Sequence, residues 1–157
     1  MSVPSSMPRT VRLWAGWCGR CHTQGRGPAI LEACRKIRQE EYPGGLPTGE
    51  AVATTGGRRP ATYVIHTVGP VYRSCGNRCA SLLAASYENS LRQAVELGCR
   101  DIAFPAISTG IYGCPKEEAA RIAYESVKRF LDKGCDLKVH FIFHSQEDRE
   151  RFEEAVR

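Results

Sequence analysis

The residues best suited to binding chemistry lie between a β-rich run at 101–105 and a helix expected at 116–131. Small hydroxylated and glycine residues at 108–110 fill this loop, and Pro115 suits the first turn of the helix. Exposed amides of such a loop and of a helix N-terminus can hold phosphate oxygens. Tyr112 offers a flat face that can cover a sugar. The pattern predicts an anion-binding loop, with an ordinary strand-to-helix turn as the alternative.

Two further residues are candidates for general acid–base catalysis. His66 lies inside an apolar run at 62–68, which favours a hydrogen-bonded structural histidine over a general base. Glu50 follows a proline–threonine–glycine turn, and no second carboxylate stands at catalytic spacing from it. We therefore assign neither residue a catalytic role, and the catalytic residues stay unknown.

A close pair of cysteines, Cys18 and Cys21, permits a redox interpretation. The string 14–22 looks like a thioredoxin active-site turn, and 18–22 also fits a c-type haem attachment motif. Neither has its usual context, because no convincing strand occupies 4–12 and residues 23–27 interrupt the following helix. No further close pair follows Cys75 and Cys79 in the sequence to complete a zinc site, so no metal site is expected.

Hydrophobic periodicity places these residues in an alternating series of strands and helices. The segments expected to form strands are 51–54, 62–68, 101–105 and 137–143. The segments expected to form helices are 28–38, 81–97, 116–131 and 146–156. Strands that alternate with helices indicate an α/β fold, in which helices cover the faces of a largely parallel sheet.

Composition sets limits on location and partners. The 157 residues are 42% hydrophobic and 25% charged, as in a single globular domain. No apolar stretch reaches the roughly 18 residues of a membrane helix, and residues 1–12 lack a signal peptide, so we expect a cytoplasmic protein with mostly reduced cysteines. Four of the five net positive charges fall within 1–27. The remainder therefore lacks the charge expected of a nucleic-acid-binding surface.

Several strings in order resemble one family. Residues 47–51, 63–70, 104–113 and 116–120 are similar, in sequence and spacing, to the motifs of macro domains, which bind ADP-ribose. The resemblance covers 28–157. It implies a three-layer α/β/α fold with a mixed, largely parallel sheet, and a ligand such as ADP-ribose or O-acetyl-ADP-ribose, with no cofactor.

The same resemblance implies the ligand-binding residues. The diphosphate is expected on the loop after residue 105, and the adenine near the last strand. His144 stands where the family often has an aromatic residue that stacks on adenine, although a solvated histidine at a strand end is the alternative. The implied ligand-binding residues are Ala106, Ile107, Ser108, Thr109, Gly110, Ile111, Tyr112 and His144.

Residues 1–27 do not fit the family. A macro domain should begin with two strands and a helix, and should carry an adenine-binding Asp, a catalytic Asn and a first glycine-rich phosphate loop. Codons compatible with 17–27, read one nucleotide later, can encode Gly-Val-Asp-Gly-Ala-Ile-His-Arg-Ala-Ala-Gly, which is that loop. We therefore interpret 1–27 as an out-of-frame segment before a macro domain at 28–157 that lacks its N-terminal strands. A divergent N-terminus is the alternative.

The resemblance further implies an activity. Macro domains of this kind hydrolyse O-acetyl-ADP-ribose or mono-ADP-ribosyl esters, and mono-ADP-ribosylated proteins are possible partners. Because the family's catalytic Asn and Asp are absent from residues 1–27, we expect impaired turnover and weakened binding in this chain. A non-catalytic ADP-ribose reader and a thioredoxin-like redox protein using Cys18 and Cys21 are the alternatives.

Overall fold

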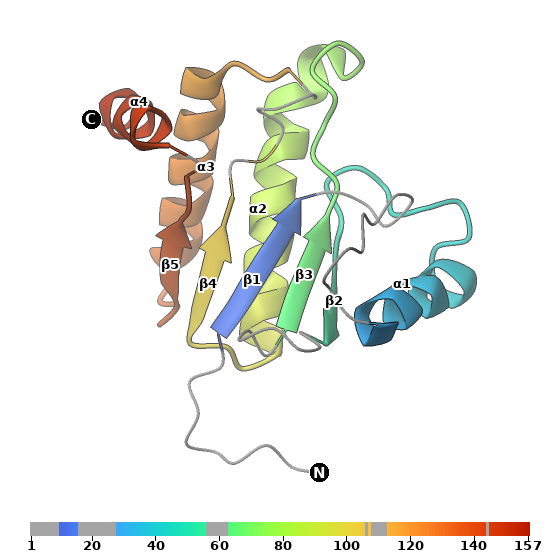
Figure 1. Cartoon of the computed structure of the whole chain (residues 1–157). Coiled ribbons are helices and arrows are strands. Elements are labelled where there is room, and N and C mark those ends of the chain that lie inside the picture. Colours follow the sequence, from blue (N-terminus) through green and yellow to red (C-terminus); the bar gives the residue numbers. More distant parts are fainter. Residues whose placement is uncertain (1–9, 16–27, 56–62, 106, 108–112, 144) are drawn as a thin grey trace.

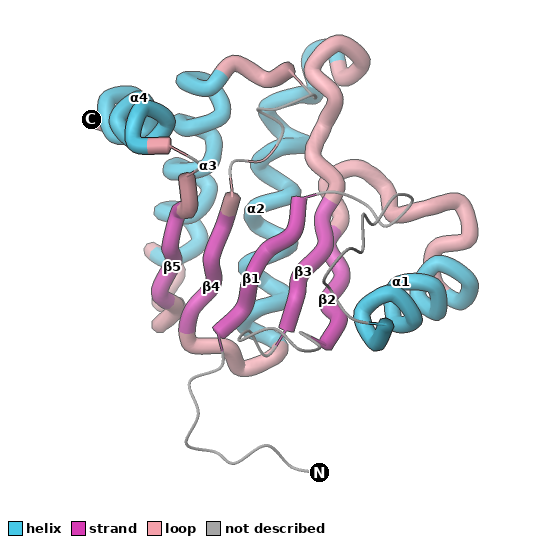
Figure 2. Tube along the Cα trace, viewed as in Figure 1, coloured by secondary structure: helices cyan, strands magenta, loops and turns pink. Residues whose placement is uncertain are grey.

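The protein is built around one five-stranded sheet. The computed structural model describes residues 10–15, 28–55, 63–105, 107, 113–143 and 145–157. The strands are β1 (Thr10–Ala15), β2 (Ala51–Thr55), β3 (Tyr63–Thr67), β4 (Asp101–Phe104) and β5 (Lys138–Phe141), in the spatial order β2-β3-β1-β4-β5. All neighbours are parallel except β2 and β3, which are antiparallel. The expected mixed, largely parallel sheet is confirmed (Figures 1 and 2).

The central strand, β1, was not expected. Sequence analysis found no convincing strand before residue 28, yet β1 pairs with β3 on one side and with β4 on the other. Both partners lie far away in the sequence, so the hydrogen bonds that define this strand leave no local signal. The alternation of Val11, Leu13 and Ala15 with Arg12 and Trp14 is the one sequence feature that agrees with it.

Helices cover both sides of the sheet. Figure 1 shows α2 (Cys79–Glu96) and α3 (Lys116–Leu131) behind it, with α4 (Gln146–Ala155) packed against α3. On the nearer side α1 (Pro28–Glu40) lies beside β2, and a short 3-10 turn, Gly76–Arg78, leads into α2. Gly98, two residues after the end of α2, has a φ of 69°, a conformation that favours glycine.

The hydrophobic core lies between the sheet and the α2–α3 pair. Ile65, Leu83, Leu91, Ile102 and Phe104 are completely buried in it. Burial of each such side chain contributes about 1.5–3 kcal/mol relative to leaving it in water. This core fixes the position of β4, and therefore the point at which the predicted phosphate loop leaves the sheet.

Two cysteines contribute to the core and two form a disulfide. Cys99 and Cys114 are buried within the core as small apolar residues. Cys75 and Cys79 form a disulfide at the start of α2. Within the described ranges, no group of three or more His, Cys, Asp or Glu side chains could hold a metal ion.

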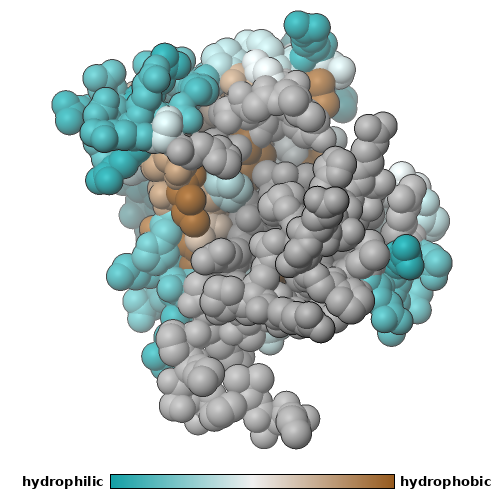
Figure 3. Space-filling view, viewed as in Figure 1, coloured by the Kyte–Doolittle hydropathy of each residue, from teal (hydrophilic) through white to brown (hydrophobic). Residues whose placement is uncertain are grey.

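The edge of the sheet at β5 carries apolar surface. Figure 3 shows hydrophobic atoms in this region, beside the hydrophilic surface of α4. Ile142, which follows β5, is 52% exposed. No helix in the described part of the chain is long and apolar enough to cross a membrane.

Candidate functional site

Four parallel strands deliver their following loops to one edge of the sheet. Phe104 at the end of β4 is in register with Phe141 at the end of β5, and Ala15 at the end of β1 is in register with Thr67 at the end of β3. The predicted phosphate loop follows β4, and His144 follows β5. The topology therefore directs segments that are distant in the sequence toward the same edge.

One point on this edge has special topology. After β1 the chain passes through α1 toward β2 and β3, whereas after β4 it passes through α3 to β5 on the opposite side. The helices that follow these two neighbouring strands also lie on opposite sides of the sheet (Figure 1). Ligands of open α/β sheets bind at such switch points, because the loops diverge there and leave a crevice. The loop edge of the sheet at β1 and β4 is therefore the candidate site.

The structure describes one of the predicted ligand-binding residues. Ile107, two residues beyond Pro105, is 1% exposed, and its backbone amide donates a hydrogen bond of 3.5 Å to the Tyr87 hydroxyl. A buried side chain at this position anchors the start of the loop. The other predicted residues lie outside the described ranges: Ala106, Ser108, Thr109, Gly110, Ile111, Tyr112 and His144.

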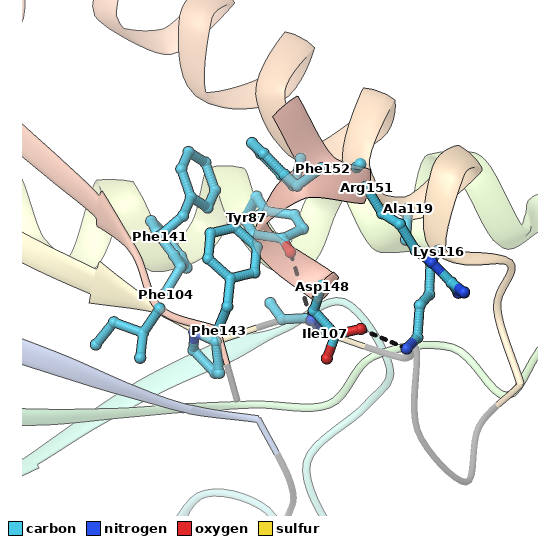
Figure 4. A pocket seen from close by; sticks show the side chains of 14 residues that line it. Tyr87, Phe104, Ile107, Lys116, Ala119, Phe141, Phe143, Asp148, Arg151 and Phe152 are labelled. Atoms are coloured by element: carbon cyan, nitrogen blue, oxygen red, sulfur yellow. Dashed lines mark hydrogen bonds and ion pairs between the residues drawn. The ribbon is translucent and has the colours of Figure 1, made fainter. Parts of the chain in front are cut away.

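A cavity of about 180 Å³ lies beside this anchor. Figure 4 shows that its walls are mainly aromatic, and the rings of Tyr87, Phe104, Phe141, Phe143 and Phe152 contribute to them. Neighbouring rings are in contact, with centroids 5.1 Å apart for Tyr87 and Phe104 and 4.8 Å apart for Phe141 and Phe152. Pockets for molecules of drug size or larger occupy about 300–1,000 Å³. The cavity is therefore a small apolar space beside Ile107 and cannot hold a dinucleotide by itself.

Charged residues close one end of the cavity. Lys116, the first residue of α3, forms an ion pair of 2.5 Å with Asp148 in the first turn of α4. The hydrogen bond from Lys116 lowers the pKa of the Asp148 carboxyl. Since the Lys116 ammonium is already paired, the anion-binding capacity of this helix start resides mainly in its backbone amides.

Two buried groups at the base of the loop have raised pKa values. Burial raises the pKa of the Tyr87 phenol, and the hydrogen bond from the Ile107 amide opposes part of this increase. Burial also raises the pKa of the Cys114 thiol, with a smaller contribution from the charge of Glu118. Both side chains are therefore neutral near pH 7, so Tyr87 can offer a hydroxyl oxygen as an acceptor without introducing a buried charge.

Comparison with known proteins agrees with this architecture. The family model for the macro domain matches residues 13–123. The chain belongs to the macro domain family. The matched range includes the last three residues of β1 and the loop after β4, and it begins inside the segment that sequence analysis separated as 1–27.

The similarity to known macro domain proteins covers most of this chain. A macro domain-containing protein of Streptomyces griseus is 49% identical over 138 residues, which span 88% of this chain and 76% of that protein. A protein of Citrobacter koseri named O-acetyl-ADP-ribose deacetylase is 44% identical over 131 residues, spanning 83% and 73% respectively. A variant macrodomain from Oceanobacillus iheyensis with ADPR has a TM-score of 0.85 and 34% identity, covering 95% of this chain and 84% of that one. These matches give the thioredoxin-like alternative no support.

Two residues considered for acid–base chemistry have structural partners in this macro domain. His66 is 2% exposed, and its Nε2 lies 2.9 Å from the Thr54 hydroxyl, as predicted for a hydrogen-bonded histidine. Glu50 is exposed, and its backbone carbonyl accepts a hydrogen bond of 2.7 Å from Thr67. These contacts join the turn before β2 to the end of β3.

Sequence reasoning missed Tyr87 and Asp148. Tyr87 occupies an apolar position of an amphipathic helix, where a tyrosine is indistinguishable from an ordinary core aromatic residue. Asp148 lies in the first turn of a charged helix, and its partner Lys116 is 32 residues away. No local pattern identifies either contact.

Proposed function

We propose that this macro domain binds ADP-ribose and that the loop after β4 receives the diphosphate. The observation that carries the proposal is the departure of this loop from the sheet at the β1–β4 switch point. Two relatives support the choice of ligand, since one structure contains ADPR and one protein is named for O-acetyl-ADP-ribose.

The chemistry required of the loop is electrostatic. A diphosphate carries negative charge that backbone amides can stabilise without a metal ion, particularly beside the N-terminus of a helix such as α3. Gly110 allows the backbone to approach the ligand because it has no Cβ. The Ser108 and Thr109 hydroxyls are proposed as further donors, and His144 as the residue beside the adenine.

Calorimetric titration with ADP-ribose tests the binding. We expect saturable binding by the full chain and its loss in Gly110→Val, because the added side chain blocks the approach of the phosphates. Gly44→Val is the matched control, since its Cβ position has no neighbouring atom within 4 Å. Absence of binding by the unsubstituted chain, or equal binding by Gly110→Val, would contradict the proposal.

For the parent macro domain we propose hydrolysis of O-acetyl-ADP-ribose or of mono-ADP-ribosyl esters, with mono-ADP-ribosylated proteins as partners. Positioned groups near the distal ribose must hold the attacking water, since proximity and orientation supply much of such catalysis. The family resemblance assigns this work to an Asn and an Asp from the N-terminal segments. This chain has no Asn before Asn77 and no Asp before Asp101.

The missing Asn and Asp favour a second candidate, a non-catalytic reader of ADP-ribose. A hydrolysis assay with O-acetyl-ADP-ribose, performed on protein whose ADP-ribose affinity has been measured, distinguishes the two. Binding without turnover above that of the free ester supports the reader. Turnover that Gly110→Val abolishes and Gly44→Val preserves supports the hydrolase.

A further inference from the structure

We propose that Tyr87 is a positioning residue for the diphosphate, because its hydroxyl fixes the start of the loop that follows β4. This inference rests on the proposed ADP-ribose-binding function. It concerns a residue on α2, behind the sheet, rather than a residue of the loop itself.

The contact between Tyr87 and the loop is through the backbone. The Tyr87 hydroxyl accepts a hydrogen bond of 3.5 Å from the amide of Ile107, and Figure 4 shows this contact among the residues that line the cavity. The hydrogen bond to Tyr87 holds the Ile107 amide in one orientation. Because the chain is continuous, this orientation restricts the path of the backbone that follows Ile107. A hydrogen bond to the backbone can therefore affect the ligand without touching it.

The ring of Tyr87 is itself held firmly. It is 2% exposed and packs on Phe104, the last residue of β4, with ring centroids 5.1 Å apart. Phe104 is completely buried and in turn stacks near Phe141 of β5. The hydroxyl is thus presented by a rigid aromatic group at the end of the strand from which the loop departs.

A second buried residue lies beyond the predicted loop in the sequence. Cys114, two residues before α3, is buried in the core. Ile107 and Cys114 flank the predicted phosphate-binding residues in the sequence. Tyr87 contacts the first of these two buried residues, and loss of that contact would raise the entropic cost of ordering the predicted binding segment around a ligand.

Tyr87→Phe is the informative variant, because it removes the hydroxyl and retains the ring that packs on Phe104. We expect ADP-ribose affinity to fall about five- to tenfold, as for the loss of one hydrogen bond that preorganises a site. Val127→Ala is the control. It removes core volume about 16 Å along α3 from Lys116 and should lower thermal stability without changing affinity.

Hydrogen exchange followed by mass spectrometry supplies a second readout that needs no ligand. In Tyr87→Phe the peptide containing Ile107 should exchange faster, whereas Val127→Ala should leave it unchanged. If both variants lose stability and neither loses affinity nor protection at Ile107, Tyr87 is only a core residue and the inference is overturned.

The two proposals fail in different ways. If the unsubstituted chain does not bind ADP-ribose, the proposed function is wrong, and with it the role of Tyr87 in diphosphate binding. The exchange comparison then still decides whether the hydroxyl anchors the loop. If the unsubstituted chain and Tyr87→Phe bind ADP-ribose equally well, the proposed function stands and the role of Tyr87 is wrong.

Discussion

Lys116 and Asp148 join the first turns of α3 and α4 through an ion pair of 2.5 Å. Both side chains are partly exposed, at 44% and 27%, so solvent screening keeps the contribution to stability small. The pair lies at the charged end of the aromatic cavity and holds α4 beside the loop edge of the sheet.

The first prediction concerns pH. Because Lys116 lowers the folded-state pKa of Asp148, the pair stabilises the protein above about pH 3.9, the ordinary pKa of aspartate, and this contribution is lost as the pH falls through the folded-state value. The unfolding temperature of Asp148→Asn should therefore be lower than that of the unsubstituted chain at pH 7, and the two temperatures should converge at lower pH. Glu125→Gln, an exposed carboxylate on α3, is the control. A difference that grows in acid would contradict this assignment.

The second prediction concerns the buried contact between Thr54 and His66. Thr54→Val keeps the shape of the side chain but removes the hydroxyl that lies 2.9 Å from His66 Nε2. Loss of one buried hydrogen-bond partner should lower the free energy of unfolding by about 1–3 kcal/mol. Urea denaturation measures the change. Thr48→Val, at an exposed position, should have little effect, and equal stability of the two variants would show that the contact is energetically neutral.

The third prediction concerns the turn before β2. Gly49 has a φ of 89°, and a Cβ added there would lie 3.3 Å from the Cβ of Ala85 on α2. Gly49→Ala should therefore destabilise the protein by about 1–2 kcal/mol, the cost of a left-handed conformation for a residue with a side chain. Gly44→Ala has open space around the new methyl group and serves as the comparison in the same denaturation experiment. Similar stability of both variants would exclude strain at Gly49.

The fourth prediction uses the Cys114 thiol. Burial is the main cause of its raised pKa, and the charge of Glu118 adds a smaller increase. Glu118→Gln should therefore lower the pKa of the thiol and increase the thiolate fraction. Cys114 should then react faster with a thiol reagent near pH 8, as followed by peptide mass spectrometry. Glu117→Gln alters the neighbouring, exposed carboxylate and should leave the rate unchanged. Equal acceleration by both substitutions would indicate a general effect of helix charge.

The fifth prediction concerns residues 17–27. Codons of the gene should permit Gly-Val-Asp-Gly-Ala-Ile-His-Arg-Ala-Ala-Gly in the frame shifted by one nucleotide. Codons that forbid Val-Asp-Gly-Ala-Ile-His would end the hypothesis. Where they permit it, a chain with the restored loop should bind ADP-ribose about tenfold more tightly or better, because a second set of amides can then contact the diphosphate. The chain as given is the reference in the same titration.

Local patterns predicted most elements well. The helix expected at 116–131 has those bounds in the structure. The strand expected at 51–54 is one residue longer, as β2, and the strand expected at 62–68 is one residue shorter at each end, as β3. The helix expected at 81–97 begins two residues earlier, as α2 at Cys79, and the strand expected at 137–143 is shorter, as β5. Periodicity records which face of an element is buried, but the last hydrogen bonds at its ends depend on neighbours elsewhere in the chain.

The family resemblance is confirmed, and Ile107 lies at the base of the loop, but Ser108, Thr109, Gly110 and Tyr112 remain predictions. Tyr87 could not be identified because the same helical spacing describes a tyrosine that only fills the core.

By itself, the sequence determined the α/β class, the macro domain family and the position of the phosphate-loop motif, because periodicity and ordered motifs are properties of contiguous residues. Only the tertiary structure decided that β1 lies between β3 and β4, that the direction of the chain connections reverses at these two strands, and that Tyr87 contacts Ile107. These relationships join residues that are distant along the chain, and the sheet brings them together through backbone hydrogen bonds that carry no information about residue type.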